Sequence, residues 1–161
     1  MNVLEELKGA ETVGITGHIR PDGDCIGSCM GLYSYLKDNC PQLDVTVYLE
    51  TPGSEFHYIR DIDKIQTIPD IKKEYDVFFV LDCSSLDRIE PFHSCFENAK
   101  KTVCIDHHIS NGSFADVNVV DAQASSACEV LYRTLEDDKI SKDTAACIYT
   151  GLSLIHISEP T

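Results

Sequence analysis

The sequence predicts an α/β fold in which a parallel β-sheet carries helices on both faces, in the manner of Rossmann-like domains. Short apolar runs, typical of strands buried on both faces, alternate with longer stretches of helical periodicity. This alternation indicates strand–helix–strand units, whose strands run parallel. The 161 residues contain no repeat and no low-complexity linker, so we expect a single domain.

Five strands are expected. The first covers residues 11–17, where two glycines allow close approach of the backbone. The others are expected over 44–49, 75–81, 101–105 and 116–120.

The clearest helix is expected over residues 26–39. Its apolar residues recur at helical spacing, and Pro41 follows its end. Further helices are expected over 92–99, 125–136 and 142–152.

The charge balance limits the partners of this chain. It has 13 basic and 27 acidic residues, a net charge of −14. Such a chain is poorly suited to gripping long duplex nucleic acid by its phosphates. A small phosphorylated substrate remains compatible if metal ions supply positive charge. No apolar run approaches the ~20 residues that cross a bilayer, so we expect no membrane role.

The eight cysteines predict free thiols in a cytoplasmic protein. They form no C-x-x-C pair, and the N-terminal residues do not read as a signal peptide. A redox protein is an alternative interpretation, but it needs a low-pKa thiol in an electropositive setting, which the acidic composition disfavours.

Three polar strings follow three of the expected strands. They are the string with His18, Asp22 and Asp24, the single Asp82, and Asp106-His107-His108. Strand ends of a parallel sheet meet at one edge, and crowded carboxylates repel unless they share protons or a cation. Oxygen donors with one or two imidazoles suit a hard or borderline divalent ion, so we expect a two-metal hydrolytic site.

Each string also has a purely structural interpretation. Asp22 would sit in a turn, Asp24 would cap the following helix, and Asp82 would be a turn residue. The coincidence of three such strings at strand ends favours the site. One imidazole of the His107-His108 pair would bind metal while the other donates to a phosphate, with Asp106 orienting one ring.

These strings resemble the DHH phosphoesterases, and most closely the branch of bifunctional oligoribonucleases and pAp phosphatases. The matching segments are HIRPDGDCIGS from His18, LDCSSLDR from Leu81, DHHISN from Asp106 and SSACE from Ser125. The likeness extends from the first strand to Gly151.

The resemblance implies a set of roles. One ion would be held by His18, Asp22 and Asp82, and a second by Asp24, Asp82 and His107, with Mn²⁺ the usual metal. The implied catalytic residues are His108, Asp106 and Asp82, and a water between the two ions would attack phosphorus. We expect substrate contacts from Arg20, Arg88 and Asn111. The implied substrates are very short oligoribonucleotides and the 3′-phosphate of pAp.

The end of the chain departs from the family pattern. The family carries an aspartate four residues after the glycine equivalent to Gly151, where this chain has Ile155, with His156 next to it. Residues 153–161 resemble a translated sequencing adapter, and the family's C-terminal substrate-binding domain is missing. We therefore expect residues 1–152 to be an incomplete catalytic domain from a truncated reading frame, with impaired activity.

Two alternatives stay open. A related DHH pyrophosphatase or cyclic-dinucleotide phosphodiesterase would share the same motifs. A metal- or nucleotide-binding module without turnover would fit the loss of the aspartate at position 155.

Overall fold

The fold is an all-parallel five-stranded sheet with the strand order β2-β1-β3-β4-β5. The computed structural model describes the backbone of residues 1–158 and the side chains of residues 1–152. The strands are β1 (Thr12–Thr16), β2 (Asp44–Tyr48), β3 (Val77–Leu81), β4 (Lys101–Asp106) and β5 (Val117–Val120). The α-helices are α1 (Val3–Glu6), α2 (Gly23–Asn39), α3 (His93–Glu97), α4 (Ala127–Tyr132) and α5 (Lys142–Ser158). The α/β class and the parallel sheet predicted from the sequence are therefore confirmed.

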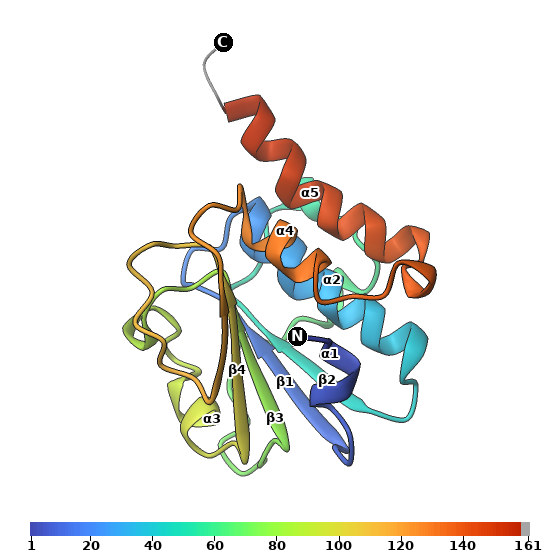
Figure 1. Cartoon of the computed structure of the whole chain (residues 1–161). Helices are drawn as coiled ribbons and strands as arrows, with labels where there is room; N and C mark the ends of the chain where they lie inside the picture. The colour runs from blue at the N-terminus through green and yellow to red at the C-terminus, as the bar shows by residue number, and fades with distance from the viewer. Residues whose placement is uncertain (159–161) are drawn as a thin grey trace.

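Helices cover both faces of the sheet (Figure 1). Residues of α1, α2 and α4 share one hydrophobic cluster with one face, and α3 belongs to a second cluster on the other. The long helix α5 packs on α2 and α4 and forms an outer layer over them.

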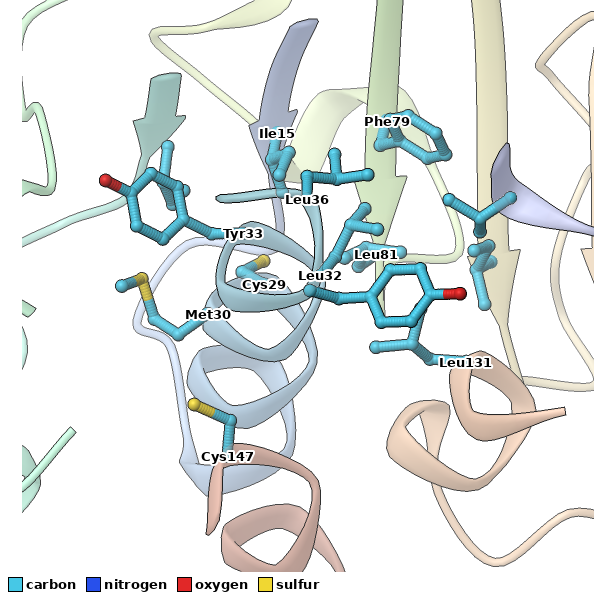
Figure 2. Packing of buried hydrophobic residues seen from close by; sticks show 14 of the residues in the cluster. Ile15, Cys29, Met30, Leu32, Tyr33, Leu36, Phe79, Leu81, Leu131 and Cys147 are labelled. Carbon is cyan, nitrogen blue, oxygen red and sulfur yellow. The ribbon is translucent and has the colours of Figure 1, made fainter. Parts of the chain in front are cut away.

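The central strand β3 contributes to both clusters because successive side chains point to opposite faces. Phe79 and Leu81 face α2, as Figure 2 shows, whereas Phe78 packs with α3. A Cβ atom at Gly14 of β1 would lie 2.3 Å from the Phe78 ring, so glycine is needed there. Burial of β3 on both faces holds its carboxyl end rigidly between β1 and β4.

The element boundaries differ in places from the expected ones. The short helix α1 was not expected, α3 and α4 are shorter than predicted, and α5 continues beyond residue 152 to Ser158. Both expectations about the tail, that 153–161 is foreign sequence and that Ile155 replaces a ligand beside His156, lie outside the described side chains. Within the described part of the chain, no helix is long and apolar enough to cross a membrane.

The close contact between α2 and α5 gives a first prediction. A Cβ atom at Gly27 would lie 2.5 Å from the Cys147 carbonyl oxygen, whereas one at Gly31, a turn later, would make an ordinary 3.4 Å contact. Gly27→Ala should therefore lower the free energy of unfolding by about 1–3 kcal/mol through overpacking. Gly31→Ala, the matched control, should be neutral or raise it by up to about 1 kcal/mol, because alanine favours helix. Urea unfolding measures both, and equal effects would contradict the packing described here.

Candidate active site

The three polar strings meet at the carboxyl edge of the sheet. His18 follows β1, Asp82 follows β3, and His107 follows β4, and these three strands are neighbours in the sheet. The chain leaves β1 toward β2 on one side and returns to β3 on the other, so this edge contains the topological switch point. Ligands of open α/β sheets bind at such points.

Asp82 lies at the centre of the cluster. Its side chain is almost fully buried and its backbone has the left-handed φ of 55°, which aspartate tolerates better than most residues. One carboxylate oxygen, Oδ2, lies 3.4 Å from His18 Nε2. The other, Oδ1, lies 3.4 Å from His107 Nε2. The carboxylate therefore faces imidazoles from two different strands at once.

A second carboxylate accompanies each imidazole. Asp22 Oδ1 lies 3.6 Å from His18 Nε2, and Asp24 Oδ2 lies 3.5 Å from His107 Nε2. His18 Nδ1 is 2.7 Å from the carbonyl oxygen of Ile19, and because a carbonyl only accepts, Nδ1 must donate. In the neutral ring the lone pair is then on Nε2, which leaves this nitrogen available to coordinate a metal ion. The cluster thus divides into two groups, His18 with Asp22 and His107 with Asp24, and both groups share Asp82.

Asp22 and Asp24 also perform backbone roles. Asp22 is the N-cap of α2 and accepts a hydrogen bond of 2.9 Å from the Cys25 amide. Asp24, in the first turn of α2, accepts from the amides of Ala127 and Cys128 at the start of α4, at 2.9 and 3.0 Å. The alternative interpretation, in which Asp24 caps α2, is therefore wrong, because Asp22 is the N-cap of α2 and Asp24 accepts from the amides of α4 instead.

The backbone of the outer helix approaches Asp24 closely. A Cβ atom at Gly151 of α5 would lie 2.9 Å from Asp24 Oδ1 and 2.4 Å from the Cys128 sulfur. The absence of a side chain at Gly151 leaves the room that this carboxylate occupies.

Asp106 holds the ring of His108. The Asp106 carboxylate is fully buried. Its Oδ1 lies 2.6 Å from His108 Nδ1, and its Oδ2 accepts a hydrogen bond of 2.8 Å from Asn111 Nδ2. Asn111 also donates to the Cys83 carbonyl and accepts from the Ser113 amide. Its amide is engaged within the protein, so the substrate contact expected of Asn111 stays a prediction.

The carboxylates and imidazoles shift one another's ionisation. Asp22 and Asp82 raise the pKa of His18 to about 11, and Asp82 raises the pKa of His107. Burial together with the nearby Asp82 charge raises the pKa of Asp24 to about 6. Burial opposes ionisation of Asp82, but the two imidazoles outweigh it and lower its pKa. The raised pKa values of the two imidazoles show that the carboxylates around them favour a positive charge at this place.

The donor set fits divalent cations. Among the residues that the structure describes, no lysine or arginine forms an ion pair with Asp22, Asp24, Asp82 or Asp106. The spacings of 3.4–3.6 Å within each group are longer than the 2.7–3.2 Å of typical hydrogen bonds. Two ligand atoms bound to one ion at about 2.1 Å lie about 3.0–3.4 Å apart. Oxygen and imidazole donors at this spacing suit a hard or borderline ion in each group.

A cavity of about 290 Å³ opens beside the cluster. Arg88 lines it, whereas Arg20 is not among its lining residues, so a substrate contact from Arg20 stays a prediction. Ser84 and Ser110 also line the cavity, and the sequence analysis missed both. Each stands two residues after a site residue, Asp82 or His108, and that spacing was the available signal. A larger cavity, about 630 Å³, is lined by residues of the 51–67 segment and does not include the cluster.

Comparison with known proteins shows the family of this chain. The profile of the DHH family, N-terminal domain, matches residues 12–152, a span that includes every residue of the cluster. The chain belongs to the DHH family. The resemblance recognised from the motifs is thereby confirmed.

The chain is similar to two named relatives and to one solved structure, among others. A Streptococcus mutans protein named as a probable bifunctional oligoribonuclease and PAP phosphatase is 29% identical over 93% of this chain. A Bacillus subtilis protein named as a bifunctional oligoribonuclease and PAP phosphatase is 24% identical over 88% of it. The crystal structure of an exopolyphosphatase-related protein from Bacteroides fragilis superposes with a TM-score of 0.81 at 27% identity, over 95% of this chain. The chain spans 47%, 45% and 48% of these proteins, about half the length of each.

The two hydrogen bonds that Asp24 accepts from α4 give a second prediction. Asp24→Ala leaves two buried amides without partners, and each should lower the free energy of unfolding by about 1–3 kcal/mol. Loss of the repulsion between Asp24 and Asp82 should offset part of this cost. We expect a net loss of about 2–4 kcal/mol in the free energy of unfolding, measured in urea with a chelator present. Asp22→Ala, which frees one amide of the helix cap and removes a largely exposed contact with His18, should cost about 1 kcal/mol. A loss no larger for Asp24→Ala than for Asp22→Ala would show that Asp24 does not support α4.

Proposed function

We propose that this chain forms the catalytic half of a metal-dependent phosphoesterase with two divalent ions. Its substrates would be very short oligoribonucleotides and the 3′-phosphate of pAp, a proposal supported by the relatives' names of oligoribonuclease and PAP phosphatase. The observation that carries the proposal is the Asp82 carboxylate, whose two oxygens each face a different imidazole at 3.4 Å. One residue is thereby placed to join two ion sites.

The ligand set that we propose follows the two groups of the cluster. His18 and Asp22 would hold one ion and His107 and Asp24 the other, with Asp82 shared. Bound there, a pair of divalent ions supplies an activated water and offsets the charge on the phosphoryl oxygens. The oxygen-rich donors make Mn²⁺ a suitable metal.

His108 has a separate role in this proposal. Its Nδ1 is held by Asp106, which leaves Nε2 as the nitrogen available to a ligand in the cavity. In its imidazolium form, a ring held in this way donates from Nε2 to a phosphate oxygen or to the leaving oxygen. Asp106 fixes the ring and its tautomer, as a carboxylate behind a functional histidine does.

Arg88 is the one arginine among the residues that line the cavity, and no lysine lines it. We propose that its guanidinium binds a substrate phosphate, for which its paired donors are well shaped. The net charge of −14 fits a small phosphorylated substrate better than a long polyanion.

Metal binding is the first test of this proposal. After removal of metals by a chelator, Mn²⁺ should stabilise the chain by about 2.7 kcal/mol at a hundredfold excess over its dissociation constant, seen as a rise in Tm. Asp82→Asn should abolish the rise, because it removes the shared charge while asparagine keeps the left-handed backbone. The exposed Asp87→Asn serves as the control and should behave as wild type. An undiminished rise in Asp82→Asn would contradict the shared ligand.

Turnover is the second test. With Mn²⁺, the chain should release phosphate from pAp and mononucleotides from a diribonucleotide, and His108→Asn should lower kcat by about 10²–10⁴-fold, the usual contribution of a proton donor. His93→Asn is the matched control, because this histidine begins α3 and its ion pairs are with Glu90 and Glu97, neither of which belongs to the cluster. Polyphosphate is tested in parallel, given the name of the Bacteroides fragilis protein. Equal activity of His108→Asn and wild type would rule out the role of His108.

A further inference from the structure

A buried thiol lies beside the first group of metal ligands. Cys25 is fully buried in the first turn of α2, and its sulfur lies together with ligand atoms of His18 and Asp82, all within 4.8 Å of one another. Among the side chains that the structure describes, Cys25 is the one cysteine that is grouped with histidine and aspartate in this way. The proposed roles of the cluster use oxygen and nitrogen donors and leave this sulfur unused.

The backbone around Cys25 fixes where the sulfur lies. Its amide donates to Asp22, and its Sγ lies 3.9 Å from the carbonyl oxygen of His18, so the thiol sits under the loop that follows β1. A Cβ atom at Gly17 would lie 2.3 Å from this sulfur. Glycine at the end of β1 therefore makes the room that the thiol fills.

The spacing of these donors is close to that of one coordination sphere. With bonds of about 2.1 Å to nitrogen or oxygen and about 2.3 Å to sulfur, two donors on opposite sides of an ion lie up to about 4.4 Å apart. The ligand atoms of His18, Cys25 and Asp82 all lie within 4.8 Å of one another, a range that includes such separations. The side chain of Asp22 is 67% exposed and Cys25 is fully buried, so the two reach the His18–Asp82 pair from the solvent side and the interior side.

We propose that Cys25 is a thiolate ligand of the ion held by His18 and Asp82. This inference rests on the metal site of the proposed function. It implies that the two ion positions of that site differ in their donor atoms. The position at Asp24 and His107 offers oxygen and nitrogen donors alone, whereas the position at His18 binds borderline and soft ions such as Co²⁺, Zn²⁺ and Cd²⁺ more tightly than those donors would. On binding, the sulfur gives a lone pair to the ion and the thiol proton passes to solvent.

Cobalt tests the proposal without any assay of activity. The whole chain, stripped of metal and kept reduced by a phosphine, is titrated with Co²⁺, and the near-ultraviolet absorption is recorded. We expect a sulfur-to-cobalt charge-transfer band that saturates with one thiolate ligand per chain. The band should be lost in Cys25→Ser and in Cys25→Ala, the second variant guarding against a failure of the first to fold. Cys40→Ser, at the opposite end of α2, should keep it.

The possible failures are distinguishable. Binding of Co²⁺ seen by calorimetry or by its visible bands, with no sulfur band in the wild type, would overturn the thiolate ligand and leave the proposed metal site standing. Persistence of the band in a folded Cys25 variant would do the same. A chain that binds no cobalt at all would overturn both this inference and the metal site of the proposed function.

Discussion

The position of one carboxylate organises this protein. Asp82 follows the central strand, and its two oxygens face histidines supplied by the strands on either side. A buried carboxylate is costly unless it is paired or binds a cation. The sheet order, the rigid burial of β3 and the left-handed turn at Asp82 serve to hold that carboxylate between its two partners.

Much of the fold was readable from the sequence because apolar runs and helical periodicity are local signals. The five expected strands exist, and the strings at three strand ends meet as the parallel topology requires. The ends of α3 and α4 were less predictable, because a helix in a packed fold ends where tertiary contacts end it. The short helix α1 could not be detected by the spacing of its apolar residues, because four residues make hardly more than one turn.

Parts of the site were not readable, for a related reason. That Asp24 binds the start of α4 depends on a contact between residues about a hundred positions apart, and no local pattern encodes it. The position of the Cys25 sulfur beside Asp82 likewise depends on how distant segments pack. The hydrogen bond between Asn111 and Asp106 is local, but it depends on the conformation of the loop after β4, which residue type alone does not give. Residue type and spacing therefore indicated which side chains gather, but not which of them support the others.

The close approach of α5 to the site has a consequence for how this protein tolerates change. Gly151 has no side chain with which to bind an ion, yet its backbone stands where any added side chain would press on Asp24. Random mutagenesis scored for lost function should therefore identify Gly151 in the outermost layer of helices, although this residue has no functional side chain. The region intolerant of mutation thus extends through two layers of helix, well beyond the residues that carry charge.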